Sequence, residues 1–64
     1  MQTESYRNGW IAHRKRAPVQ DNPYDEVTQA ISHAWWTSGW CERFNAAKHG
    51  RLTDAMDQEM MFRE

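Results

Sequence analysis

The chain has 64 residues, a formal net charge of −1 and 39% hydrophobic residues, which is enough for one small domain. Its single cysteine, Cys41, excludes an intrachain disulfide and a cysteine-rich metal site. No apolar run approaches the roughly 20 residues of a membrane span, and no signal-peptide pattern is present. We therefore expect a cytoplasmic protein with a reduced thiol and no membrane partner.

The first expected helix begins with a cap at Thr3 or Ser5 and ends near Ala17, just before Pro18. Its apolar side chains recur at helical spacing. They are Tyr6, Trp10, His13 and Ala17. The segment PVQDNP, residues 18–23, contains two prolines and no periodicity, so it is expected to be a linker.

The second expected helix has Asn22 as N-cap and Pro23 as its first residue. It ends near Lys48, because Gly50 suits the left-handed conformation that stops helices. Two apolar stripes run along it, since adjacent residues lie about 100° apart on a helix. One stripe contains Tyr24, Val27, Ile31, Ala34, Trp35 and Ser38, and the other contains Trp36, Trp40, Phe44 and Ala47. One stripe can cover the first helix, so the other needs a third helix, a second copy or a partner.

Residues 52–64 form an acidic, methionine-rich tail that allows a short third helix capped by Thr53. Its apolar face contains Leu52, Ala55, Met56, Met60 and Phe62. The expected fold is therefore all-α. Residues 1–51 form a two-helix antiparallel hairpin with a proline-bounded linker, and residues 52–64 form a C-terminal helix or tail.

Two glycines, Gly9 and Gly39, each precede a tryptophan inside an expected helix. Glycine there costs about 1 kcal/mol relative to alanine, so its presence needs a reason. A missing side chain lets another helix approach closely. We expect a tight helix–helix crossing with a core of tryptophan packed around it, because branched aliphatic residues are scarce.

Three short patterns occur in order: G-W-x-A at residues 9–12, Pro-Tyr at 23–24 and W-x-x-G-W at 36–40. Together they resemble the ribosome modulation factor family of small bacterial proteins, over roughly residues 6–47. The resemblance implies two helices joined by a linker. It also implies binding to the small ribosomal subunit near the 3′ end of its RNA, which silences ribosomes in pairs during starvation. The family name further covers a branch described as a kinase of a quinolone antibiotic.

The charge distribution along the chain identifies a candidate RNA-binding segment. Residues 7–20 include the run HRKR at 13–16 and contain no acid. Cations contact phosphates, and nearby aromatic rings stack on exposed bases. The expected RNA-binding residues are Arg7, Trp10, His13, Arg14, Lys15, Arg16, Tyr24, Arg43 and Lys48. The alternative is that these cations are solvated and complement a helix C-terminus.

A second interpretation is a protein-interaction module, with or without homodimer formation. Its expected contact residues are Trp36, Trp40, Phe44, Met56 and Met60. Methionine-rich surfaces adapt easily to protein partners, although the same residues can close the core. A further hypothesis is that the acidic tail blocks the basic helix in cis.

We expect no enzymatic activity, metal or cofactor. The chain contains no phosphate-binding loop and only two lysines. The histidines His13, His33 and His49 are scattered, with no pair at metal-ligand spacing beside a third ligand. The leading interpretation is therefore a non-enzymatic translation regulator that binds ribosomal RNA.

Overall fold

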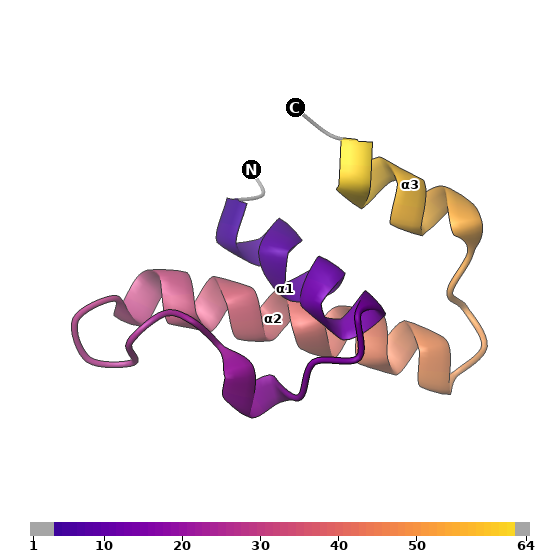
Figure 1. Cartoon of the computed structure of the whole chain (residues 1–64). Coiled ribbons are helices and arrows are strands. Elements are labelled where there is room, and N and C mark those ends of the chain that lie inside the picture. Colours follow the sequence, from indigo (N-terminus) through magenta and orange to yellow (C-terminus); the bar gives the residue numbers. More distant parts are fainter. Residues whose placement is uncertain (1–3, 63–64) are drawn as a thin grey trace.

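The computed structural model describes the chain from residue 4 to residue 62, except for the side chain of Phe62. It contains three α-helices, α1 (Glu4–Arg14), α2 (Ala30–Lys48) and α3 (Asp54–Phe62), and a short 3-10 helix, η1 (Val19–Asp21) (Figure 1). No strand occurs among these residues, so the all-α expectation is confirmed. The candidate cap Thr3 and the apolar role of Phe62 lie outside the described part.

The two main helices cross while running in the same direction (Figure 1). The ring of Tyr6 contacts that of Trp35, with centroids 6.1 Å apart. Later in α1, the ring of His13 lies 5.0 Å from Trp40 and 5.9 Å from Phe44. Residue numbers thus rise together along both helices, whereas in an antiparallel pair they would change in opposite senses. The expected antiparallel hairpin is wrong.

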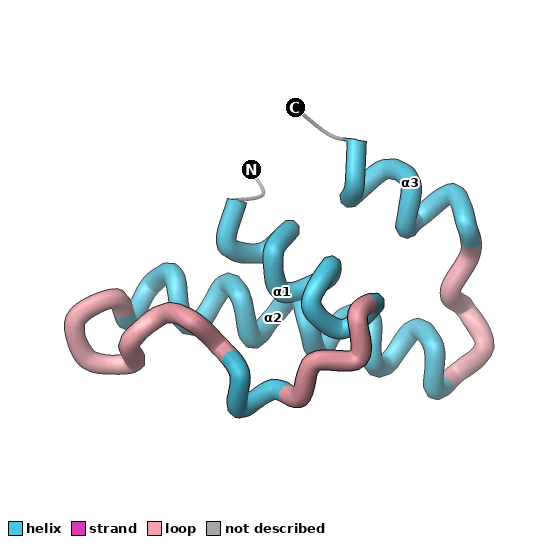
Figure 2. Tube along the Cα trace, viewed as in Figure 1, coloured by secondary structure: helices cyan, strands magenta, loops and turns pink. Residues whose placement is uncertain are grey.

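The connection between α1 and α2 explains this direction, because it returns along α2 before the second helix begins (Figure 2). The indole nitrogen of Trp40 donates a hydrogen bond of 2.8 Å to the carbonyl oxygen of Ala17. Further along, the amide of Asn22 donates to the His33 carbonyl (3.0 Å) and to the Thr37 hydroxyl (3.2 Å). The segment antiparallel to α2 is therefore the connection, not α1.

The helix α2 begins later than the Asn-Pro pair predicted. The side-chain oxygen of Asn22 accepts the backbone N–H of Tyr24 at 3.0 Å, which forms a local turn. A carboxylate oxygen of Asp25 accepts the N–H groups of Val27 (2.7 Å) and Thr28 (2.9 Å). Such side-chain bonds compete with helical backbone bonds, so residues 26–29 form a turn.

The C-terminus of α1 lies at Arg14, earlier than the expected end near Ala17. The N–H of Ala17 donates to the Ala12 carbonyl (3.0 Å), and the N–H of Arg16 donates to the His13 carbonyl (2.9 Å). These two bonds form a Schellman motif, which needs a left-handed residue after the helix. Arg16 fills that position with a φ of 66°, although left-handed backbone costs about 1–2 kcal/mol for a residue with a side chain.

The helix α2 also ends in a Schellman motif, with glycine, the usual residue, in the left-handed position. The N–H of Arg51 donates to the Ala46 carbonyl (2.7 Å), and the N–H of Gly50 donates to the Ala47 carbonyl (3.2 Å). Gly50 has a φ of 70°, and because glycine lacks a Cβ atom this left-handed conformation causes no steric strain. The predicted end of the second helix at Lys48 is confirmed.

The predicted close approach at the two glycines is confirmed. A Cβ atom on Gly9 would overlap the carbonyl oxygen of Trp36 and lie 2.7 Å from its carbonyl carbon. A Cβ on Gly39 would overlap the carbonyl oxygen of Tyr6 and lie 3.1 Å from the backbone nitrogen of Trp10. The backbones of α1 and α2 therefore touch at both glycines, and only glycine fits at either position.

The core lies around this crossing and is covered by α3. Trp10 and Trp36 are each only 2% exposed, so the expectation of a tryptophan core is confirmed for this pair. Met60 is buried as well, and α3 packs against α1. The hydroxyl of Thr53 accepts the Met56 N–H at 3.3 Å, which confirms Thr53 as the cap of the third helix. None of the helices within residues 4–62 has the length and apolar character needed to cross a membrane.

Candidate nucleic-acid interface

The end of α1 and the second half of α2 enclose an open hollow of about 490 Å³. Its wall includes the loop residues Ala17 and Pro18. The basic and aromatic side chains that line it are His13, Arg14, Arg16, Trp40, Arg43 and Phe44. This surface is named the groove below. It combines residues expected to contact RNA with residues expected to contact a protein.

The floor of the groove is an ordered aromatic cluster. Trp40 and Phe44 are one helical turn apart on α2, and their rings stack with centroids 5.5 Å apart and planes 12° apart. The ring of His13 meets both edge-on, at 85° and 84°. The hydrogen bond from Trp40 to the Ala17 carbonyl fixes the indole. Phe44 remains 43% exposed, so part of its ring is free to contact a ligand.

Arg43 lines the groove and contacts His13 of this aromatic cluster. Its Nη1 lies 2.9 Å from Nδ1 of His13. Because arginine only donates, Nδ1 accepts and the imidazole carries its proton on Nε2. Burial, followed by the charge of Arg43, lowers the pKa of His13 below its ordinary value of 6.5, against the opposing influence of Asp57. His13 is therefore neutral at pH 7 and contributes a ring rather than a charge.

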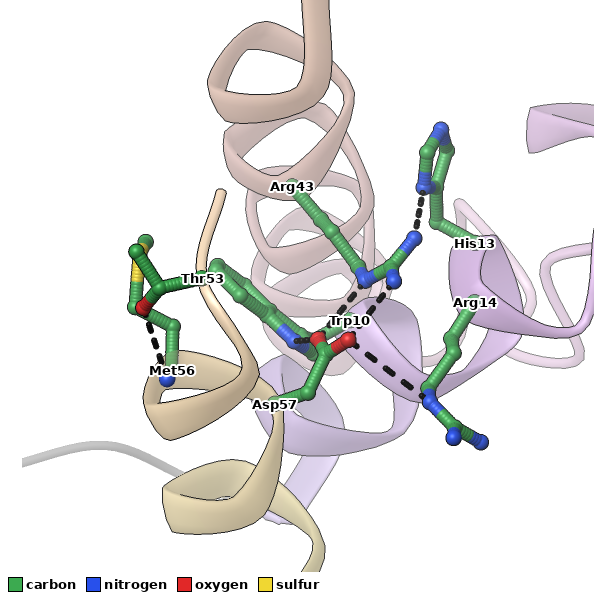
Figure 3. A network of polar contacts seen from close by, with 7 residues as sticks. All are labelled: Trp10, His13, Arg14, Arg43, Thr53, Met56 and Asp57. Atoms are coloured by element: carbon green, nitrogen blue, oxygen red, sulfur yellow. Dashed lines mark hydrogen bonds and ion pairs between the residues drawn. The ribbon is translucent and has the colours of Figure 1, made fainter. Parts of the chain in front are cut away.

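Asp57 of α3 lies at the centre of a polar network beside the groove (Figure 3). Arg43 donates to its two oxygens from Nε (2.9 Å) and Nη2 (2.8 Å), and Trp10 donates from its indole nitrogen (2.8 Å). Arg14 forms an ion pair of 3.6 Å with the same carboxylate. The hydrogen bond from Arg43 is the main cause that lowers the pKa of Asp57, and the Trp10 bond and both arginine charges add to it against burial.

Sequence reasoning did not identify Asp57 as a site residue. It was one of several acids in a tail whose overall charge alone suggested contact with the basic helix. The available signal was its position three residues before Met60, which places it next to the buried side of α3.

Five of the nine expected RNA-binding residues do not line the groove. Trp10 is buried in the core, so it cannot stack on a base in this conformation. Tyr24 lies in the connection, where its hydroxyl accepts a hydrogen bond of 3.3 Å from the Asn8 amide. The other three are Arg7, which is half-buried, and Lys15 and Lys48, which are exposed.

The expected protein-binding residues also separate. Trp36 and Met60 are buried and belong to the core, and Met56 is half-buried. Only Trp40 and Phe44 face the groove. Among the described residues, large apolar side chains are more exposed elsewhere: Val27, in the turn before α2, is 82% exposed, and Ile31, in the first turn of α2, is 76% exposed.

The fold and the site together define a class: a small three-helix protein with an open groove of arginines around stacked aromatic rings. Within residues 4–62, no group of three histidine, cysteine, aspartate or glutamate side chains is placed to hold a metal ion. No protein-family model, no curated protein and no solved structure matches the chain.

Proposed function

We propose that the chain is a non-enzymatic regulator of translation that binds single-stranded ribosomal RNA of the small subunit through the groove. The observation that carries this proposal is the juxtaposition of a partly exposed Phe44 ring with Arg14, Arg16 and Arg43. Bases need an aromatic surface and phosphates need cations, and the groove offers both within one hollow.

The groove supports a specific arrangement of the RNA. A base stacks on the free part of Phe44, which is worth roughly 1–3 kcal/mol. The exposed guanidinium groups of Arg14 and Arg16 contact the flanking phosphates. Trp40 stacks on the Phe44 ring and His13 meets it edge-on, and these contacts hold the ring in place. Lys15 and Lys48 are exposed and supply weaker, peripheral attraction.

The resemblance to the ribosome modulation factor family is the reason for choosing ribosomal RNA. The patterns that carry it occupy structural positions. Gly9 and Gly39 form the crossing, Trp36 fills the core and Trp40 forms the floor of the groove. The residues that carry the resemblance form the helix crossing and the floor of the groove. This supports a family-like role for the groove.

A titration of a labelled single-stranded RNA, taken from the 3′ end of small-subunit RNA, tests this proposal by fluorescence anisotropy. Phe44→Ala should weaken binding about 5- to 150-fold, the loss of one stacked base. The matched control Ile31→Ala removes an exposed apolar side chain at the other end of α2 and should leave affinity unchanged.

Salt gives the second readout of the same titration. Two phosphate contacts to single-stranded RNA predict a slope of log K against log salt of about −1.4. Affinity should then fall roughly sevenfold between 50 and 200 mM salt. Absence of binding at 50 mM salt, or equal losses for the two variants, would contradict the proposal.

The exposed start of α2 favours a second candidate function, a protein-interaction module. No Asp, Glu, Lys or Arg occurs from residue 27 to residue 41. Val27, in the turn before α2, and Ile31, in the first turn of α2, are exposed, and the ring of Trp35 is partly exposed. Binding through this surface should be nearly independent of salt and should be lost in Ile31→Asp, whereas the groove variants should leave it intact.

A further inference from the structure

We propose that Arg14 and Arg43 form a phosphodiester subsite of the groove, which Asp57 occupies in the free protein and from which an RNA phosphate displaces it. This inference rests on the proposed RNA-binding function and adds its regulation. The α3 helix then acts as a built-in competitor for the ligand.

The contacts of Asp57 are those that a phosphate would make. Arg43 donates two parallel hydrogen bonds to the two carboxylate oxygens, of 2.9 and 2.8 Å. The Arg14 guanidinium lies 3.6 Å from one of them (Figure 3). The planar guanidinium fork accommodates carboxylates and phosphates with the same two-point geometry. A carboxylate in this position therefore occupies a place suited to a phosphodiester.

The subsite opens onto the groove, because both arginines also line it. Arg14 in addition borders a smaller hollow of about 280 Å³ on the α3 side, together with Asp57. The side chain of Arg14 is 46% exposed, whereas those of Arg43 and Asp57 are 12% and 16% exposed. A phosphate can thus reach Arg14 directly, but it gains the two donors of Arg43 only when Asp57 leaves.

The α3 helix is an element that can leave locally. It has only nine residues, and an isolated helix of that length is marginal in water. Its buried anchors are Met60 and the network at Asp57, and it contacts α1 far less than α2 does. Elements with few buried contacts open at lower free energy than the core. Displacement of α3 therefore leaves the crossing of α1 and α2 in place.

Asp57→Asn tests the competition with little change in shape. The variant removes the negative charge, while its side-chain oxygen can still accept the Trp10 indole bond. In the wild type the phosphate replaces the ion pair that Asp57 already makes with Arg43, whereas in the variant it pairs with a cation that has no carboxylate partner. The affinity for the single-stranded RNA should therefore rise about fivefold at 0.1 M salt, and the salt slope should steepen by about 0.7. The matched control is Glu59→Gln, which makes the same charge change at an exposed position of α3. It should leave both quantities close to those of the wild type.

The outcomes separate this inference from the proposed function. If the wild type binds RNA but Asp57→Asn behaves like Glu59→Gln, the inference is overturned and the RNA-binding function stands. If neither the wild type nor Asp57→Asn binds RNA at low salt, the proposed function fails and the subsite fails with it.

Hydrogen exchange on the unmodified chain gives a second measurement, which keeps the inference testable if Asp57→Asn does not fold. Bound RNA should accelerate amide exchange in α3 while amides at the crossing remain protected. Unchanged or slower exchange in α3 on RNA binding would overturn the inference.

Discussion

The helix crossing and the groove lie about one helical turn apart on the same two helices, yet they are built in opposite ways. At the crossing, Gly9 and Gly39 bring backbone against backbone, and the packed atoms leave no space for a methyl group. In the groove, long basic side chains surround a ring that is partly exposed. The comparison indicates that the crossing determines the fold, whereas the groove is free to carry binding.

Trp10 and Asp57 join the two regions. The ring of Trp10 is buried in the core, but its indole nitrogen donates to the carboxylate that also holds Arg43. Stability and binding are therefore coupled through one hydrogen-bonded pair. Substitutions on either side of this pair show how far the two regions are independent.

The largest effect is expected at the crossing. Gly39→Ala places a methyl group onto the Tyr6 carbonyl, and backbone atoms cannot move aside as a flexible side chain would. We expect a loss of about 3 kcal/mol or more in the free energy of unfolding, at the upper end of the cost of overpacking. Urea unfolding followed by circular dichroism measures it. The neighbouring exposed substitution Ser38→Ala should change stability by less than about 0.5 kcal/mol.

The second-largest effect is expected at the hydrogen bond between Trp10 and Asp57. Trp10→Phe keeps an aromatic ring in the core but removes the donor to Asp57, whose carboxylate is mostly buried. We expect a loss of about 1–3 kcal/mol, measured by the same urea unfolding. Because the bond holds α3, amide exchange in α3 should accelerate more than exchange in α2. Uniform acceleration across all three helices would show that the bond does not act on α3 in particular.

Acid should destabilise the protein in two stages. His13 has a lowered pKa when folded, so the unfolded chain binds more protons and stability falls as pH drops below about 6.5. Asp57 also has a lowered pKa, so its contribution persists above about 3.8 and is lost as pH falls through its folded value. Thermal unfolding across pH should show both stages. His13→Gln should remove the first stage, and His49→Gln, at an exposed position, should leave it in place.

The smallest effect is expected at Arg16, where one substitution should change stability and binding in opposite directions. Arg16 and Gly50 occupy equivalent positions in the two Schellman motifs, with φ values of 66° and 70°. Arg16→Gly should relieve the left-handed strain and stabilise the protein by roughly 0.5–1 kcal/mol after the entropic cost of glycine. The same change removes a cation from the groove, so RNA affinity should fall while stability rises. A parallel fall in both quantities would contradict the separation of the two regions.

Part of the fold follows directly from the sequence. A glycine inside a helix needs a reason, and at Gly9 and Gly39 the reason is the close approach of two helices. The end of α2 at Gly50 and the cap at Thr53 depend on local chemistry, so they were predictable too. The direction of α1 relative to α2 was not, because it depends on the hydrogen bonds of the connection, such as that between Asn22 and Thr37.

The candidate site was predictable only in pieces. The basic run identified Arg14 and Arg16, and the aromatic stripe identified Trp40 and Phe44, but nothing in the sequence placed them in one groove. That required the crossing geometry and the direction of the helices. Asp57 was missed because its role depends on contacts with Trp10 and Arg43, which lie 47 and 14 residues away in the chain.

Co-sedimentation with small ribosomal subunits tests the central claim, that the groove binds ribosomal RNA. The wild-type chain should pellet with the subunit at 50 mM salt and largely dissociate at higher salt. Charge reversal of Arg14 and Arg16, which line the groove, should abolish co-sedimentation. The same reversal of Lys15 and Lys48, which are exposed outside the groove, should weaken it only partly. No co-sedimentation at low salt, or equal losses for the two reversals, would contradict the account.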